Sequence, residues 1–104
     1  MKQKQVIELI KETAKRILPS GASLWLYGSR ARGDARPDSD YDLLILLDND
    51  TVPPEVDSAA YDISLMGYDN NVEINTHIYP RSKWNSWTYS PFYKNVEQDK
   101  IVLI

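Results

Sequence analysis

The sequence predicts an α+β fold in which helices pack against a small mixed β-sheet. Three observations favour this class: apolar residues recur at helical spacing near the N-terminus, two short apolar runs occupy 22–27 and 41–47, and residues 72–79 alternate between apolar and polar. With weaker helical patterns between them, they give the element order α-β-β-α-β-α-(β). A chain of 104 residues has room for little more than one core, so we expect a single domain over residues 1–104.

The first two elements are an amphipathic helix and a buried strand. Lys, Glu and Gln fill one face of residues 3–18, and a Pro-Ser-Gly step at 19–21 should end the helix. The opposite, apolar stripe consists of Val6, Ile10, Ala14, Ile17 and Leu18. The run ASLWLY at residues 22–27 is short and mostly apolar between two glycines, which is typical of a strand buried on both faces.

The middle of the chain carries the strongest strand signal. YDLLILL at residues 41–47 is almost continuously apolar and is followed by polar residues and two prolines. Apolar residues at three- and four-residue steps predict a second helix over residues 55–66, ending near Gly67. The alternating run VEINTHIY at residues 72–79 predicts a third strand with Glu73, Asn75, His77 and Tyr79 on its polar face.

The C-terminal part is less regular. Residues 80–90 mix two tryptophans with polar residues and support no assignment, residues 91–98 predict a short helix, and residues 101–104 form either a terminal strand or an apolar tail. Core packing explains most aromatic residues of this region, and we assign Phe92 to the core. Trp84 and Trp87 stay open, because an exposed patch that stacks a base or docks a partner is an alternative.

Composition excludes several classes of protein. The 42% hydrophobic and 26% charged residues are ordinary for a globular chain, and a net charge of -3 argues against general nucleic-acid binding. The absence of cysteine excludes disulfides and thiolate metal sites, which fits a reducing compartment. No apolar run approaches the length that spans a membrane. We therefore expect a soluble cytoplasmic protein without membrane partners.

Three chemical features converge between the first two strands. Gly28 and Ser29 directly follow the first strand, so their backbone amides and the Ser29 hydroxyl are suited to face a phosphate, with glycine permitting close approach. Asp40 and Asp42 open the second strand two residues apart, which puts both carboxylates on one face. Carboxylate oxygens on a fixed surface are the ligands that Mg²⁺ prefers.

The loop between these ends adds positive charge. Arg30, Arg32 and Arg36 are cations able to offset a triphosphate, although alone they are ordinary for a solvated loop. A lone Gly-Ser is usually a turn, and a lone Asp-x-Asp is usually a solvated strand end. The joint arrangement is far more specific.

The stretch GSRARGDARPDSDYDLLILL, residues 28–47, resembles the signature of the minimal nucleotidyltransferases, a branch of the DNA polymerase β superfamily. Its hallmark is Gly-Ser, a spacer, and Asp-x-Asp at the start of a strand. The element order on both sides agrees with that family's nucleotidyltransferase fold. The resemblance implies that Ser29 holds the terminal phosphates and that Asp40 and Asp42 bind two Mg²⁺ ions, which activate a hydroxyl and stabilise the leaving pyrophosphate.

The resemblance also implies a third carboxylate on a later strand. Glu73 is the only acid in the run VEINTHIY and is our candidate, both as a metal ligand and as a catalytic residue, although the family usually has Asp there. An ordinary surface glutamate is the competing interpretation. Asp62 is a weaker substitute because it falls in the second helix. Asp34 and Asp38 are expected to orient the arginines rather than to bind metal.

Two functions follow. The first is a metal-dependent enzyme that transfers a nucleoside monophosphate, AMP from ATP by preference, to an acceptor hydroxyl. The resemblance implies a partner such as a small helical HEPN protein, which a family member modifies as an antitoxin, and a homo-oligomer is another way to complete the pocket. The second is a nucleotide-binding or partner-neutralising module with little or no catalysis, and the position of the Glu73 carboxylate should distinguish the two.

Overall fold

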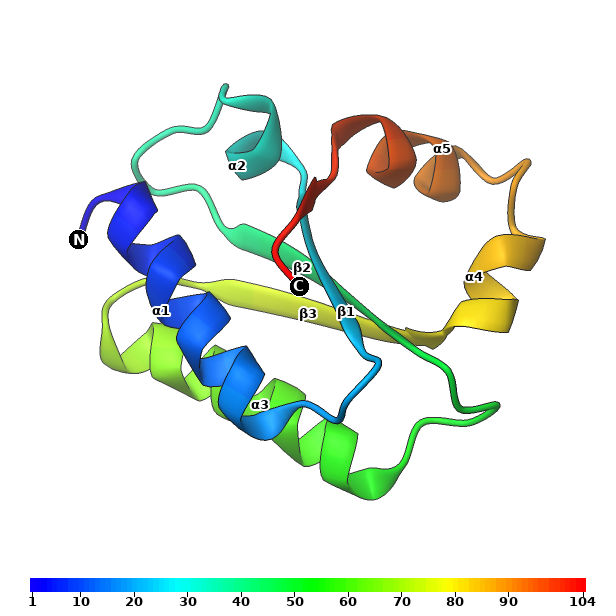
Figure 1. Cartoon of the computed structure of the whole chain (residues 1–104). Coiled ribbons are helices and arrows are strands. Elements are labelled where there is room, and N and C mark those ends of the chain that lie inside the picture. The colour runs from blue at the N-terminus through cyan, green and yellow to red at the C-terminus, as the bar shows by residue number, and fades with distance from the viewer.

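The computed structural model describes residues 1–104 and contains a four-stranded sheet with helices on both faces (Figure 1). The α+β class expected from the sequence is confirmed. The elements in chain order are α1 (Gln3–Ile17), β1 (Ser23–Tyr27), α2 (Ser29–Arg32), β2 (Tyr41–Leu47), α3 (Pro54–Asp69), β3 (Ile74–Pro80), α4 (Arg81–Ser86), α5 (Pro91–Asp99) and β4 (Ile101–Val102).

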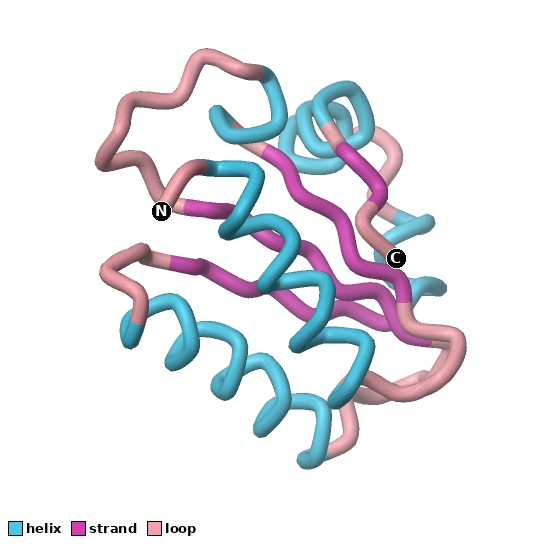
Figure 2. Tube along the Cα trace, turned by 60° about the vertical axis from the view of Figure 1, so that its left-hand side comes forward, coloured by secondary structure: helices cyan, strands magenta, loops and turns pink.

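The sheet is mixed, with the strand order β3-β2-β1-β4. Strand β1 is antiparallel to both β2 and β4, whereas β2 and β3 are parallel. A parallel pair needs a crossover, and α3 supplies it between β2 and β3. Figure 2 shows the strands as neighbouring tubes, with β3 at one edge of the sheet, lying along α3.

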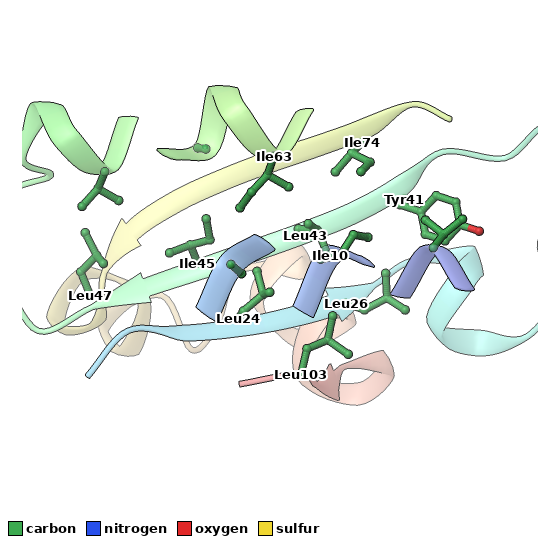
Figure 3. Packing of buried hydrophobic residues seen from close by; sticks show 14 residues of the cluster. Ile10, Leu24, Leu26, Tyr41, Leu43, Ile45, Leu47, Ile63, Ile74 and Leu103 are labelled. Atoms are coloured by element: carbon green, nitrogen blue, oxygen red, sulfur yellow. The ribbon is translucent and has the colours of Figure 1, made fainter. Parts of the chain in front are cut away.

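Strand β2 is buried on both faces because helices cover both sides of the sheet. The larger core, on the side of α1 and α3, takes Leu43, Ile45 and Leu47 from β2 (Figure 3). The smaller core, on the side of α4 and α5, takes Leu44 and Leu46. Strand alternation therefore puts the even-numbered residues of β2 on the face of α4 and α5, and that face also receives the acids that open the strand.

Helix α3 continues to Asp69, beyond the expected end near Gly67. Gly67 is buried inside the helix, where a Cβ atom would come within 2.6 Å of the Ile74 Cδ1 atom. The glycine thus permits close packing of β3 on α3 and does not end the helix. The chain reverses instead at Asn71, which has a left-handed φ of 61°. Strand β3 begins at Ile74, so Val72 and Glu73 precede it.

Helix α4 is an element that the sequence did not predict. It is short, and one residue anchors it: Trp84 is buried in the smaller core, and its indole Nε1–H donates to Glu97 Oε2 at 2.9 Å. Trp87 and Phe92 are half-buried and pack against the same cluster. The core interpretation therefore holds for these three residues. No helix of the structure has the length and hydropathy needed to cross a membrane.

Gly67→Ala should lower the free energy of unfolding by about 1–2 kcal/mol. Overpacking a core costs about 1–3 kcal/mol, which exceeds the roughly 0.5–1 kcal/mol that alanine gains over glycine in a helix. Ser58→Ala, at an exposed position of the same helix, should change stability by less than about 0.5 kcal/mol. Urea denaturation of the two variants measures the difference, and equal stabilities would contradict the packing role of Gly67.

Candidate active site

The bend after β1 is formed by a glycine in a backbone conformation that other residues rarely adopt. Gly28 has φ 73° and ψ −157°, and a Cβ atom there would lie 2.6 Å from Asp42 Oδ2. Asp42 is directly opposite Tyr27 in the antiparallel register of β1 and β2, so the bend and the carboxylate meet at the same end of the sheet. Gly28 and the Asp42 carboxylate are therefore direct neighbours.

Residues 29–32 form the single turn of helix α2. The Gly28 carbonyl accepts from the amides of Ala31 and Arg32, both at 3.0 Å, and the Ser29 carbonyl accepts from Gly33. These bonds leave the amides of Ser29 and Arg30 outside the turn's own hydrogen bonding, because the first amides of a helical turn have no partner within it. Such amides, together with the half-buried Ser29 hydroxyl, form a surface suited to an anion.

Asp40 and Asp42 are held together by an amide that the sequence analysis did not single out. Asn75 Nδ2 donates to Asp40 Oδ2 at 3.1 Å and to Asp42 Oδ1 at 3.3 Å. The parallel register places Asn75 opposite Asp42. One side chain of β3 therefore bridges the two carboxylates of β2 and fixes them on the same face.

Glu73 lies beside Asp40 and not beside both aspartates. Its contact with the Asp40 carboxyl, followed by the repulsion between the two negative charges, raises the pKa of Glu73 above its ordinary value. Its backbone carbonyl accepts from the Tyr41 amide at 2.8 Å, which fixes the residue at the mouth of the β2–β3 pair. A hollow of about 210 Å³ separates it from the arginine-rich loop and is lined by Arg30, Asp38, Ser39, Asp40 and Asn71, among others.

The acids fit a divalent cation in part. No three Asp, Glu, His or Cys side chains are placed to share one metal ion, so the expected ligand trio Asp40, Asp42 and Glu73 is not assembled. The aspartate pair nevertheless presents hard oxygen donors on one rigid face, and its protein partner in that face is the neutral Asn75 amide. Mg²⁺ usually takes one or two carboxylates and completes its shell with water and phosphate oxygens. The pair alone therefore suits Mg²⁺.

The three arginines have different roles. The Arg30 guanidinium donates to the carbonyls of Ser39 (2.9 Å) and Pro37 (3.1 Å), and it stacks 4.4 Å from the centre of the Tyr41 ring. This cation holds the loop that leads into the acid pair. Burial raises the pKa of the Tyr41 hydroxyl, and the positive charge of Arg30 partly opposes this rise.

Arg32 turns away from the acid pair, because it bridges Asp99 at 2.9 Å and Asp34 at 3.1 Å. Arg36 is exposed, and only its backbone is engaged: its amide donates to the Ser39 hydroxyl at 2.8 Å, and its carbonyl accepts from the Ser39 amide at 3.0 Å. Of the three cations expected to meet a triphosphate, Arg36 is thus the one whose guanidinium stays available. Asp62, the weaker acid candidate, is exposed on α3.

A row of aromatic side chains lies on the same face of the sheet as the acid pair, and Tyr27 is its member next to Asp42. Tyr27 packs edge-on against Phe92 at 5.7 Å between ring centres, and His77 stacks with Tyr79 at 6.4 Å. Burial, the charge of Asp42 and the neighbouring Tyr79 raise the pKa of Tyr27 to about 12. The Tyr27 hydroxyl therefore stays protonated next to Asp42 at neutral pH. His77 belongs to this aromatic row.

Comparison with known proteins identifies a family and a shared fold. The family described as "Nucleotidyltransferase domain" matches residues 7–104. A crystal structure of a toxin–antitoxin with AMP-PNP shares the fold with a TM-score of 0.64 and 15% identity, over 100% of this chain and 73% of that chain. A protein of Sulfolobus solfataricus described as a nucleotidyltransferase gives 0.61 and 17%, over 96% and 80%.

The toxin–antitoxin MntA–HpeT, in a form with two aspartates changed to glutamate, gives a TM-score of 0.61 and 11% identity, over 100% of this chain and 73% of that chain. At these identities the structural likeness concerns the fold alone. No curated protein sequence matches the chain.

Gly28→Ala should destabilise the protein more than Gly33→Ala. Both glycines have positive φ, but a Cβ atom at Gly33 would meet nothing within 4 Å, whereas at Gly28 it would meet the Asp42 carboxylate. At Gly33, in the left-handed helical region, alanine costs about 1–2 kcal/mol of backbone strain. Gly28 lies in a region that is essentially restricted to glycine, and only Gly28→Ala adds the clash. Denaturant unfolding and a crystal structure of Gly28→Ala test this; an undisplaced Asp42 would refute the close approach.

Arg30→Ala should lower the free energy of unfolding by about 1–3 kcal/mol, because charged hydrogen bonds to two loop carbonyls are lost. Hydrogen exchange of the amides of residues 34–40 should accelerate in this variant. Arg36→Ala, in the same loop, should leave both quantities nearly unchanged. If the two variants behave alike, Arg30 does not hold the loop.

Proposed function

Because this chain belongs to the nucleotidyltransferase domain family, we propose that it transfers a nucleoside monophosphate, AMP from ATP by preference, to an acceptor hydroxyl in a metal-dependent reaction. The observation that carries the proposal is the aspartate pair, which Asn75 bridges and which faces the Gly28 bend. A carboxylate pair without a protein cation in its face, next to free amides, suits a nucleotide that arrives with its own metal ions.

Each part of the site then has a role in the transfer. The amides and hydroxyl of the Ser29 turn bind the terminal phosphates, and Arg36 adds a cation that closes over them. Asp40 and Asp42 hold Mg²⁺, two ions by the resemblance, and the ions supply charge neutralisation and activation of the incoming hydroxyl when bound. Asn75 keeps the two carboxylates converged. Arg30 supports the loop from behind, and Arg32 is tied to α5 through Asp99, so neither has to contact the nucleotide.

Glu73 is proposed to accept the proton of the acceptor hydroxyl. Its carboxylate lies next to Asp40 at the open mouth of the site, where an acceptor can reach it. General-base catalysis contributes about 10²–10⁴-fold in rate, so loss of this group should slow transfer without abolishing binding of the nucleotide.

A second candidate function is a nucleotide-binding, partner-neutralising module with weak or absent catalysis. Two observations favour it: no three acids converge on one metal position, and the residue opposite Asp42 is Asn75, which donates a hydrogen bond and carries no charge. Such a site would retain the metal–nucleotide complex but lack the third ligand that orients it for displacement.

The acceptor is proposed to be a partner protein. Two of the similar structures are toxin–antitoxin assemblies, one of them with AMP-PNP, and the resemblance of the signature implies a small helical partner of the HEPN type. A second copy of the chain is the alternative that would complete the pocket.

Label transfer from ATP carrying ³²P at the α-phosphate tests the proposed function. When the protein is incubated with this ATP, Mg²⁺ and the product of the neighbouring gene, label should be transferred to that product or to the protein itself. Asp40→Asn combined with Asp42→Asn should abolish transfer, whereas Asp62→Asn, an exposed acid of α3, should not change it. Transfer that survives loss of both aspartates would contradict the assignment.

Glu73→Gln distinguishes the two candidate functions. For an enzyme, the rate of transfer should fall by about 10²-fold or more, while the affinity for Mg²⁺–ATP, measured by isothermal titration calorimetry, changes little. Wild-type protein that binds Mg²⁺–ATP but transfers no label to any acceptor would favour the binding module.

A further inference from the structure

A groove runs along the free edge of the sheet and reaches Glu73 and Asn75 at one end. Strand β3 is the last strand on its side, and α3 lies next to it. Two hollows of about 620 Å³ and 420 Å³ follow this edge, and Ser64 lines both of them. The first reaches Glu73 and Asn75, and the second ends at Tyr79. The two hollows together follow β3 from Glu73 and Asn75 to Tyr79, one residue before the strand ends.

The backbone of β3 offers unused hydrogen-bonding groups to this groove. The Glu73 carbonyl points to β2, where it accepts from the Tyr41 amide, and the Ile74 carbonyl points outward, where it accepts from the Ser64 hydroxyl at 2.9 Å. Neighbouring residues of a strand direct their N–H and C=O groups to opposite sides. The same alternation turns the backbone groups of Thr76 and Ile78 outward, with no strand to receive them.

The helical wall of the groove carries two exposed tyrosines and one acid, Asp57. Asp57, Tyr61, Ser64 and Tyr68 of α3 lie on the groove side, and the two tyrosines are 67% and 78% exposed. The whole segment from residue 37 to residue 80 contains Asp and Glu but no Lys or Arg. Tyrosine rings attract Lys and Arg side chains through their π faces. Both features therefore favour a positively charged occupant.

We propose that this groove binds an extended, basic segment of a partner protein, which adds to β3 as a fifth strand. Strand addition satisfies the outward groups of Thr76 and Ile78, and basic side chains of the segment meet Asp57 and the two tyrosines. A long unprotected edge of this kind is otherwise an aggregation hazard.

A second copy of the chain is a poorer occupant. Pairing of two β3 edges would bring two acidic walls together, and five of the chain's basic residues lie in or next to α1, which is a helix and cannot add as a strand. The groove opens toward Glu73, so a hydroxyl near one end of the bound segment would reach the acid pair. That last step rests on the proposed function, whereas binding of the segment does not.

Fluorescence anisotropy with a labelled ten-residue peptide of alternating lysine and threonine tests the proposal, and a glutamate–threonine peptide is the matched control. Only the lysine peptide should bind, with an affinity that falls as salt rises. Thr76→Pro removes one outward N–H and spares the β2–β3 ladder, as proline is tolerated at an edge. It should weaken binding at least tenfold, whereas Thr76→Val should stay within about twofold, since these hydrogen bonds come from the backbone.

Asp57→Lys provides a second variant that does not alter the strand. It should weaken binding of the lysine peptide at least fivefold, whereas Asp50→Lys, outside the groove, should not. Circular dichroism establishes that each variant is folded. Absence of lysine-peptide binding, equal binding of the glutamate peptide, or unchanged binding by both Thr76→Pro and Asp57→Lys would overturn the proposal.

Sedimentation velocity addresses the competing occupant, because a dimer that Thr76→Pro dissociates would assign the edge to a second copy and overturn the proposal as well. Asp40→Asn with Asp42→Asn should keep full peptide binding. If label transfer fails while peptide binding succeeds, the proposed function fails alone; if transfer succeeds and the peptide does not bind, the groove proposal fails alone.

Discussion

The structure of the site depends on the close approach of Gly28 to Asp42. A Cβ atom at Gly28 would lie only 2.6 Å from Asp42 Oδ2. The bend at Gly28 and the carboxylate are therefore neighbours before any ligand binds. The antiparallel register of β1 and β2 sets this approach, and the parallel register of β2 and β3 brings Asn75 to the other side of the same carboxylate. The pairing of three strands thus fixes the position of one charged group, the Asp42 carboxylate.

Holding two carboxylates close together costs free energy, because their negative charges repel each other. The neighbouring side chains offset only part of this repulsion. Asn75 gives one amide to the pair, and the nearest guanidinium, Arg30, is engaged with loop carbonyls and the Tyr41 ring. Glu73 adds a further negative group next to Asp40, and its pKa rises accordingly. A cation is the natural complement of such a cluster, since attraction between opposite charges is stronger where water is displaced and the dielectric constant is low. The same excess of acid continues along β3 and α3.

Much of this arrangement could be predicted from the sequence, because it rests on periodicity and on one compact signature. The apolar run of β2 and the two-residue spacing of Asp40 and Asp42 fix their strand and its faces. Other features depend on contacts between distant residues. The amide of Asn75 was placed on the correct face, but only the register reveals that it bridges both aspartates. Gly67 was expected near the end of a helix, whereas it lies inside α3 at the point where Ile74 packs on the helix.

The arginines illustrate the same limit. Charge alone cannot show that Arg30 serves the loop, that Arg32 serves α5, and that Arg36 is available, because those roles are set by carbonyls and acids far away in the chain. Helix α4 was missed for a related reason: Trp84 is its only buried residue, so its sequence shows no helical pattern of apolar residues.

Anomalous diffraction from crystals soaked with Mn²⁺ and a non-hydrolysable ATP analogue tests the central claim most directly. We expect an anomalous peak at about 2.1–2.3 Å from one oxygen of each aspartate, with the terminal phosphates against the amides of the Ser29 turn. A peak at any other acidic cluster, or phosphates bound away from that turn, would contradict the account.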